Sequence, residues 1–562
     1  MRIPVAAALI AACVAGCSAP HRTLTLVPSL PATMPPCVPA GAVNTLRVTA
    51  QGDFPPETTL TAAASPAMAA TLALPAATRA IDVEGFGPTG LAAFGRTATL
   101  TLDELPAGPL GIAYGPPDSV CAAGAMLVAR AGHHATPLAG GRVLITGGYN
   151  SGDGPATQVE LYDPRTASFA LTGASLDPRS VLAHATAPLP DGGALVTGGA
   201  VNDLKDLPAG IAFAGAVRFD ADGKTVGSAR LLVAGPRAGH SATVLADGRV
   251  LLAGGCQNLD AGACVAGATL GSTEIYDPKA DAFAAGPPLL HARVGHSAIL
   301  LGDGTVLVVG GRGEGGGAVP AEVVDPDEDR GFDAGVASGA GVGLPAGSAL
   351  LAGGTTTPDV TMSLWPSATE APLALPPLSA PRLGPTLSPL DDGSVLVAGG
   401  GDGTLALFDG RASVTTLAAT FHANDLAAAR LADGTVLLTG GAGMDATVWE
   451  WDGGAWSPLS VAAGPVGRSA FGWAYDDVAA RAVLFGGVDA GGAALADTWR
   501  FDFSSPSEAG EDCDSGFDGN GNGLVGCADP DCAGECALCG DGVCSEVESC
   551  RLCPADCGAC AE

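Results

Sequence analysis

Short apolar runs recur along residues 122–505, and each run closes on a pair of glycines. The spacing from one pair to the next is between 41 and 56 residues. Such a period predicts a repeated supersecondary unit in which each copy buries its apolar face against the next. The eight pairs are Gly147-Gly148, Gly198-Gly199, Gly254-Gly255, Gly310-Gly311, Gly353-Gly354, Gly399-Gly400, Gly440-Gly441 and Gly486-Gly487.

The clearest unit reads GHSATVLADGRVLLAGG over residues 239–255. Its two apolar runs flank Asp247-Gly248, which predicts a hairpin with a two-residue turn and positive φ at both turn positions. The glycine pair then allows a bend and a close approach of two backbones. Two more strands follow, and they carry aromatic positions at Tyr162, Tyr276, Phe169, Phe283 and Trp456.

A four-stranded unit of this length with a glycine pair in its second strand resembles the Kelch repeat of β-propellers. The resemblance covers about residues 122–505 and implies an all-β propeller of eight blades. Seven blades is the alternative, because the unit at 338–378 is degenerate. The last unit has no fourth strand of its own. Since residues 124–132 align with the fourth strand at 286–295, we expect the start of the propeller to close its last blade.

The repeats are flanked by three further regions. Residues 37–121 show alternating apolar positions, such as Leu46, Val48 and Ala50, which predict a small β-sandwich. Residues 18–36 are proline-rich and are predicted to be a linker. The propeller is assigned to 122–506, and an acidic, cysteine-rich tail to 507–562.

Residues 1–17 have a basic start, an apolar run and the ending Val14-Ala15-Gly16-Cys17. This pattern is typical of a secretory signal peptide. Its end resembles the bacterial lipobox, which implies acylation of Cys17. We therefore expect an exported lipoprotein held at the outer membrane or cell surface through lipid on Cys17.

The chain has 16 cysteines, and leaving out Cys13 and Cys17 gives an even number. In an oxidising compartment these residues are predicted to pair locally as disulfides, Cys37 with Cys121, Cys256 with Cys264, and the ten cysteines of the tail among themselves. The Cys-x-x-Cys spacings of the tail would also suit zinc, and the compartment favours disulfides over metal. The candidates are Cys37, Cys121, Cys256, Cys264, Cys513, Cys527, Cys532, Cys536, Cys539, Cys544, Cys550, Cys553, Cys557 and Cys560.

The net charge of −32 argues against a nucleic-acid partner, because phosphate binding needs a basic surface. In the tail, Asp518, Asn520 and Asn522 stand at loop positions 1, 3 and 5, and Asp529 stands at position 12. This oxygen-rich spacing resembles EF-hand-like loops and predicts a calcium site. A polar linker without bound metal is the alternative.

Several other patterns resemble catalytic or cofactor motifs. His134, His184, His240 and His296 occupy equivalent repeat positions, which favours packing over metal binding. The glycine motif at 311–316 matches a dinucleotide fingerprint but is not followed by a helix, which phosphate binding requires. The tryptophans fit core positions better than an exposed stacking surface.

The predicted function is therefore non-enzymatic: a monomeric surface lipoprotein whose propeller binds or scaffolds a protein or glycan. We expect the ligand on the face that carries the longer loops, 149–158, 200–212 and 256–271. The alternative is an extracellular enzyme that is similar to galactose oxidase, a copper enzyme of the Kelch class, with its site at the channel mouth.

Overall fold

The computed structural model describes two parts of the chain. The first part comprises residues 21–29, 45–52, 54–62, 70–87, 90–96 and 110–113. The second part is 119–502, interrupted at 151, 153, 165, 201–211, 228–229, 261–262, 329, 334–338, 345–346, 355, 368–371, 390–393, 402, 418–425, 431–435, 441–447, 452–455, 459–463 and 477–480.

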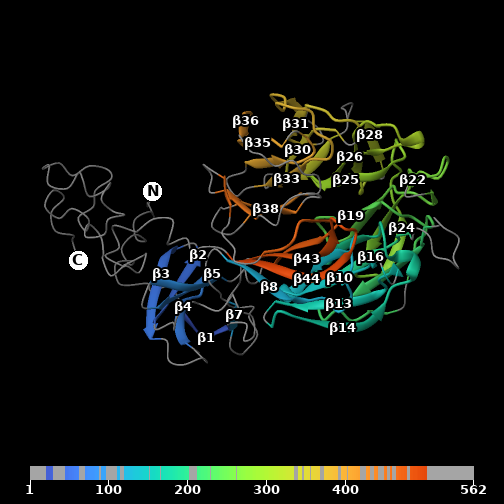
Figure 1. Cartoon of the computed structure of the whole chain (residues 1–562). Helices are drawn as coiled ribbons and strands as arrows, with labels where there is room; N and C mark the ends of the chain where they lie inside the picture. The colour runs from blue at the N-terminus through green and yellow to red at the C-terminus, as the bar shows by residue number, and fades with distance from the viewer. Residues whose placement is uncertain are drawn as a thin grey trace, which may run out of the picture.

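Two sheets precede the propeller and form the β-sandwich (Figure 1). One sheet has the order β4-β1-β7 and the other the order β3-β2-β5-β6. Leu46, Val48 and Ala50 are buried together, as their alternation predicted. The strands are β1 (His21–Ser29), β2 (Thr45–Gly52), β3 (Phe54–Ala62), β4 (Ala70–Pro75), β5 (Thr78–Gly87), β6 (Gly90–Arg96) and β7 (Leu110–Ala113).

Strand β1 corrects the assignment of residues 18–36 as a linker. It pairs with both β4 and β7 and therefore holds the centre of its sheet. Leu24 and Leu26 alternate with Thr23 and Thr25, and both leucines are buried. The proline content of the segment concealed this period-2 pattern, which is that of a half-buried strand.

Seven four-stranded sheets and one five-stranded sheet follow and form the eight blades of a β-propeller (Figure 1). The degenerate unit is a complete blade, so the seven-blade alternative is wrong. Blades 1 to 4 are β9 (His134–Pro137), β10 (Val143–Thr146), β13 (Gln158–Asp163), β14 (Ser168–Ser175); β15 (Ala185–Pro188), β16 (Ala194–Thr197), β17 (Gly215–Phe219), β18 (Arg230–Leu231); β19 (Ser241–Val244), β20 (Val250–Ala253), β23 (Thr273–Asp277), β24 (Ala282–Ala285); β25 (Val294–Leu300), β26 (Val306–Arg312), β27 (Glu322–Asp325), β28 (Arg330–Asp333).

The second half of the propeller repeats this order of strands, except that two short strands share the first-strand position in blade 8. Blades 5 to 8 are β29 (Ala340–Gly343), β30 (Ala349–Ala352), β31 (Met362–Trp365), β32 (Leu373–Ala374); β33 (Thr386–Pro389), β34 (Val395–Ala398), β35 (Leu405–Phe408), β36 (Val414–Leu417); β37 (Leu426–Arg430), β38 (Val436–Gly440), β39 (Trp449–Trp451), β40 (Trp456–Pro458); β41 (Arg468–Ser469), β42 (Gly472–Asp476), β43 (Arg481–Asp489), β44 (Ala494–Asp502). Short strand pairs lie in two loops, β11 (Tyr149–Asn150) with β12 (Gly154–Pro155), and β21 (Leu259–Asp260) with β22 (Ala263–Cys264).

The last blade is completed by a strand from the start of the propeller, as predicted. This strand is β8 (Ser119–Ala125), which pairs antiparallel with β44. This fourth strand, at 119–125, begins earlier than the aligned segment 124–132. The residues after it form the connection to blade 1. Ser119 lies opposite Asp502, so the chain enters and leaves the propeller side by side.

The hairpin turns differ from the prediction of two positive-φ positions. Only the glycine has positive φ, at +89° for Gly248. Leu245 N–H donates to Arg249 O at 2.8 Å, and Gly248 N–H donates to Leu245 O at 2.9 Å. These bonds close a three-residue loop, in which a type I turn is followed by a left-handed glycine. Asp247 contributes its carboxylate, which accepts the Arg249 N–H at 3.0 Å.

The core lies between adjacent blades, where the strand faces pack against each other. Tyr162 and Tyr276 are fully buried there, beside Phe169 and Phe283 respectively. The tryptophans pack in the same way, since Trp365 and Trp451 are buried and the others contact core clusters. These positions confirm the packing interpretation of the aromatic pattern.

Candidate functional site

One face of the propeller collects the connections between blades. On this face each first strand begins and each second strand ends, so the glycine pairs and the loops after them lie there too. We call this the connector face, and it includes the predicted ligand loops 149–158 and 256–271. The opposite face carries the hairpin turns such as Asp247-Gly248.

The glycine pairs leave no space for side chains. Gly147 and Gly148 have φ of +67° and +92°. A Cβ on Gly147 would lie 2.5 Å from Val181 O and from the His184 ring, both in the next blade. The pair is therefore required because two blades come into main-chain contact at this point.

A buried arginine fixes each of five connections. Arg237 donates to Gly254 O at 3.0 Å and to Glu274 Oε1 at 2.8 Å, and both groups are wholly buried. Glu274 Oε2 in turn accepts Val233 N–H of the same connection at 2.6 Å. We call this arrangement the arginine clamp. Its arginines are Arg130, Arg237, Arg293, Arg382 and Arg468.

The partners of the clamp vary from blade to blade. Arg130 and Arg293 repeat the buried carboxylate with Glu160 and Glu322. Arg468 uses Asp497, and Arg382 uses Thr404. Blade 2 has Ser180 instead, whose hydroxyl donates to Gly198 O at 2.5 Å.

The arginine clamp was missed in the sequence. Its signal is the repeated Arg-x-Gly-His at 237–240 and 293–296, where the arginine precedes the repeated histidine by three positions. A charged side chain at a repeated position would ordinarily be expected to face solvent. The structure shows instead that these arginines point inward to main-chain carbonyls.

Because the arginines point inward, apolar neighbours point outward on the connector face. Leu127, Val233 and Leu290 donate their N–H groups to the clamp carboxylates and leave their side chains 53–61% exposed. Ten large hydrophobic side chains are exposed among the described residues, and seven lie in the connections and loops of this face. The seven are Leu127, Tyr149, Val233, Val265, Leu290, Leu383 and Val466.

A pocket of about 320 Å³ opens on the connector face at blade 1. It lies between the connection at Leu127–Ala129 and the loop that contains β11 and β12. Asn150 and Gln158 supply polar side chains, and Pro155 with Leu127 supplies apolar ones. The pocket therefore combines an apolar rim with hydrogen-bonding groups, which suits an anchoring side chain.

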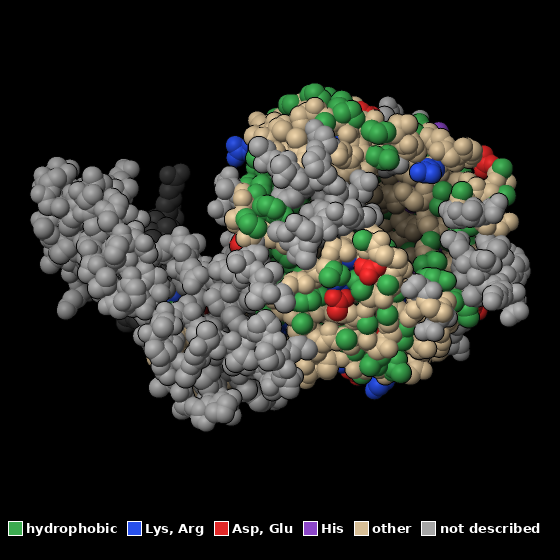
Figure 2. Space-filling model, viewed as in Figure 1, with side chains coloured by type: hydrophobic (Ala, Val, Ile, Leu, Met, Phe, Trp, Pro, Cys, Tyr) green, Lys and Arg blue, Asp and Glu red, His purple; other side chains and the backbone are tan. Residues whose placement is uncertain are grey.

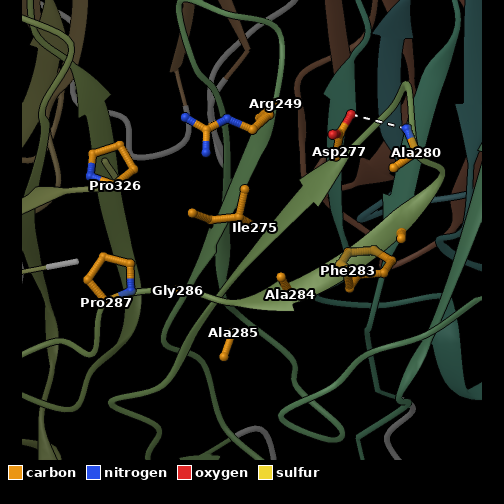
Figure 3. A pocket seen from close by; sticks show the side chains of 11 residues that line it. Arg249, Ile275, Asp277, Ala280, Phe283, Ala284, Ala285, Gly286, Pro287 and Pro326 are labelled. Atoms are coloured by element: carbon orange, nitrogen blue, oxygen red, sulfur yellow. Dashed lines mark hydrogen bonds between the residues drawn. The ribbon is translucent and has the colours of Figure 1, made fainter. Parts of the chain in front are cut away.

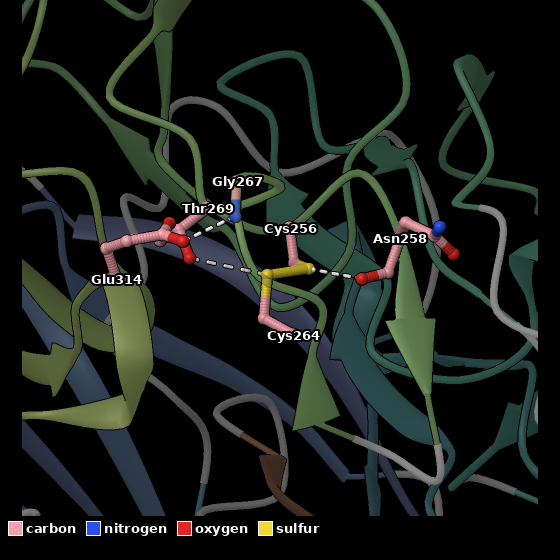
Figure 4. Close-up of a disulfide and its surroundings, with 6 residues drawn as sticks. All are labelled: Cys256, Asn258, Cys264, Gly267, Thr269 and Glu314. Carbon is pink, nitrogen blue, oxygen red and sulfur yellow. Dashed lines mark hydrogen bonds between the residues drawn. A yellow bond between two sulfur atoms is a disulfide. The ribbon is translucent and has the colours of Figure 1, made fainter.

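A disulfide shapes the loop of blade 3 on the same face (Figure 4). Cys256 and Cys264 are bonded, as predicted. The Gly267 N–H after this bridge donates to Glu314 of blade 4, so the loop is tied to its neighbour. Cys121 is also disulfide-bonded and buried in β8; its predicted partner Cys37 lies outside the described residues.

The predicted histidine set needs one correction. The repeated position holds His133, His184, His240 and His296, because the second glycine of a pair faces the Cβ of His133, His240 or His296 in equivalent geometry. His134 lies one place further on, opposite Thr146 in β9 and β10, and corresponds to Ser241. The adjacent histidines His133-His134 made the alignment ambiguous by one residue.

These histidines join neighbouring blades, which is the structural role predicted for them. His184 Nε2 lies 3.0 Å from Thr146 Oγ1, and His240 Nε2 lies 2.8 Å from Thr197 Oγ1. Burial lowers the pKa of His133 and His296 to about 3, and it holds the pKa of His184 well below its usual value. The imidazoles are thus neutral at physiological pH.

Four of the inner strands consist largely of small residues. First strands contact one another around the ring, with β42 beside β9. Strands β9, β15, β19 and β29 read HATP, ATAP, SATV and AGVG. The propeller is hollowed near its centre, and charged side chains are sparse around the hollow (Figure 2).

Within the described residues, no group of three or more His, Cys, Asp or Glu side chains is arranged to hold a metal ion. The dinucleotide motif at 311–316 forms a single 3-10 turn, η4 (Glu314–Gly316), before β27. Among these residues no helix has the length and apolar character needed to cross a membrane.

The remaining predicted sites fall outside the described residues. They are the lipidation site Cys17, the calcium ligands Asp518, Asn520, Asn522 and Asp529, and the tail cysteines from Cys513 to Cys560.

No family model matches the chain, and no curated protein matches it. Among solved structures it is similar to one described as a novel fungal alcohol oxidase with catalytic diversity among the AA5 family, in complex with copper. The identity is 16% and the TM-score 0.40, over 56% of this chain and 72% of that one. The eight-bladed fold is established by the strand pairing described above.

Proposed function

We propose that this protein is a binding module that docks a protein partner on its connector face. The concentration of exposed apolar side chains on this face supports the proposal most strongly. Contiguous or clustered apolar exposure marks interaction surfaces, and interface centres are depleted in charge. The buried arginines of the connections contribute to this depletion, because their charges do not reach the surface.

The same features favour a protein partner over a glycan. Sugar binding relies on exposed aromatic faces, and Tyr149 is the one aromatic side chain among the exposed large hydrophobics of the described residues. Leucine and valine side chains dominate the face instead. The pocket lined by Leu127 and Pro155 would receive an anchoring side chain of the partner.

Photo-crosslinking in a cell-envelope extract tests this proposal. A photoreactive amino acid is placed at Leu127, Val233 or Leu290, and control copies carry it at Leu171 or Leu373 on the outer strands. We expect one protein to be captured from the three connector positions and not from the two controls, which are equally exposed. Equal capture from both sets, or none from the connector positions, would contradict the proposal.

We further propose that the protein is exported and anchored through lipid on Cys17. The leader pattern supports this, and so does the disulfide at Cys256 and Cys264, since disulfides persist in oxidising compartments. A Cys17→Ala variant should move from the membrane fraction to the soluble fraction, measured by fractionation and immunoblotting. A variant that stays as firmly membrane-bound as the wild type would refute the anchor.

A further inference from the structure

A groove of about 450 Å³ runs along the outer strand of blade 3 (Figure 3). Ile275 of β23 and Ala282 and Ala284 of β24 line one side, and Pro326 of blade 4 faces them. The groove exists because small residues occupy this face. Blade 1 carries Thr172 where blade 3 carries Gly286, and Thr172 packs against the next blade at Gly223.

The main chain of β24 borders the groove with hydrogen-bonding groups that face away from β23. Gly286 N–H donates to Thr273 O at 3.1 Å, which fixes the pairing parity of β23 and β24. By that parity, the N–H and C=O groups of Phe283 and Ala285 point away from β23. Among the described strands β24 pairs with β23 alone, so these groups have no strand partner.

The side chain of Phe283 does not fill the groove. Strand alternation directs it to the opposite face, where the centroid of its ring lies 4.9 Å from that of Tyr276. Phe283 therefore borders the groove mainly through its backbone. An extended segment lying in the groove would reach both this free edge and the apolar floor.

One end of the groove is acidic. Arg249 lies there between Asp247 and Asp327, at 2.5 and 2.6 Å, and both carboxylates are more than half exposed. Asp277 lines the same end and caps the Lys279 and Ala280 N–H groups. The three carboxylates outnumber the two cations of this end, Arg249 and Lys279, so this end complements a positive charge.

We propose that the groove binds an extended peptide segment by strand addition to β24. The segment would carry small apolar side chains and a lysine or arginine at the end beside Asp327. Antiparallel addition places this basic residue at the C-terminal end of the segment, because β24 begins at the acidic end. This site is separate from the connector face and does not depend on the function proposed for that face.

Synthetic peptides test the site on the full-length protein. The probe is an acetylated and amidated peptide of alternating valine and alanine with one C-terminal lysine. Its binding is measured by calorimetry up to about 1 mM peptide. One control replaces the lysine with glutamate. A second control is N-methylated at alternate peptide bonds, which removes strand hydrogen bonds and keeps the side chains.

We expect saturable binding of the lysine peptide, about two- to fivefold weaker binding of the glutamate peptide, and a loss of at least about tenfold on N-methylation. An Asp327→Lys variant should reverse the charge preference. No saturable binding, or equal binding of the N-methylated peptide, would overturn the proposal.

Two protein variants locate the binding. Ala285→Pro removes a free N–H from the edge of β24 without breaking the pairing to β23, so it is compatible with the fold. Leu171→Pro is the matched control, because Leu171 has the same register position in blade 1. Only Ala285→Pro should abolish binding. A Leu127→Ser variant on the connector face should retain it, which keeps this test separate from that of the connector face. Equal loss in both proline variants would contradict the assignment to β24.

Discussion

Arg237 shows how this propeller uses charge inside its core. The residue is wholly buried, and burial lowers the pKa of its guanidinium, while Glu274 opposes this shift. The buried pair alone is weak evidence of net stability, because desolvation offsets the attraction. The clamp instead fixes the position of the connection, whose polar groups would otherwise form their hydrogen bonds with water.

A Glu274→Gln variant should be strongly destabilised. The change leaves Arg237 buried without a counter-charge, which typically costs about 3–5 kcal/mol. Guanidinium denaturation of the full chain measures the effect. The control is Asp222→Asn, whose solvent-exposed pairing with Arg142 contributes little to stability. Similar losses in the two variants would mean that the clamp does not hold the blade.

The neutral histidines predict a loss of stability in acid. The folded state keeps the imidazoles unprotonated where the unfolded chain binds protons, so protons favour unfolding. The free energy of unfolding should be greatest above about pH 6.5 and should fall by about 1.4 kcal/mol per pH unit for each such histidine. The decline continues toward the folded-state pKa of about 3 for His133 and His296.

A His296→Gln variant isolates one of these protons. Between pH 6 and pH 4 its unfolding free energy should fall less steeply than that of the wild type. The difference in slope should be about 1.4 kcal/mol per pH unit, which corresponds to one proton. Ser241→Ala is the control, because it removes the hydroxyl 3.0 Å from His296 Nε2 and no titrating group. Urea denaturation across this pH range gives both slopes. Parallel slopes for His296→Gln and the wild type would show that His296 does not titrate on unfolding.

At the residue scale, the sequence predicted the roles of repeated residues better than their exact positions in the repeat. It indicated that the repeated histidines are structural, yet it assigned His134 in place of His133. A one-residue shift cannot be resolved where two histidines are adjacent. The inward direction of Arg237 could not be predicted either, because its partner Glu274 is distant in sequence and comes near it only when the blade has folded.

At the scale of single elements, strand β8 closes the ring. Val120 is buried in a cluster with Leu437, Leu484 and Phe501, between the last two blades. The strand therefore contributes both an edge and core packing. Closure of this kind leaves the last blade without a free edge.

A Val120→Asp variant should open the ring. A carboxylate at this buried site has no partner there, and burying an unpaired charge costs roughly 3 kcal/mol or more. We expect faster proteolysis near β44 and association on size-exclusion chromatography. Ala125→Asn, at the exposed end of the same strand, adds a polar group without a charge opposite Asp497 and should behave like the wild type. A monomeric, protease-resistant Val120→Asp protein would contradict the closing role of β8.

The strands themselves were largely predictable from sequence, because each blade repeats the same apolar runs and glycine pair. The hairpin turns were not, although their residues were identified. Asp-Gly suits a two-residue turn, in which the first strand would extend to Ala246, but β19 ends two residues earlier, at Val244. The choice between these turns depends on strand length, which short apolar runs do not define.

For the whole molecule, the positions of the chain ends relative to the connector face matter most. Ser119 and Asp502 lie opposite each other at the ends of β8 and β44, on the side of the hairpin turns. The chain therefore enters and leaves the propeller on the side away from the connector face.

The charge of −32 and the glycine content indicated the class of molecule but not its binding surface. The ligand loops were placed on one face from their repeat positions. The apolar side chains of the connections were not recognised, because Leu127, Val233 and Leu290 appear in sequence to be ordinary core residues. Their exposure follows from the clamp, which fixes their backbone and turns their side chains outward.

Hydrogen exchange of the full-length protein with its cross-linked partner, measured by mass spectrometry, tests the central claim most directly. The account predicts slower exchange on binding in the connections 126–133, 231–240 and 286–293. The hairpin turns on the opposite face, such as 245–249, should be unchanged. Protection confined to the hairpin turns or to the outer strands, with the connections unaffected, would contradict the connector face as the binding surface.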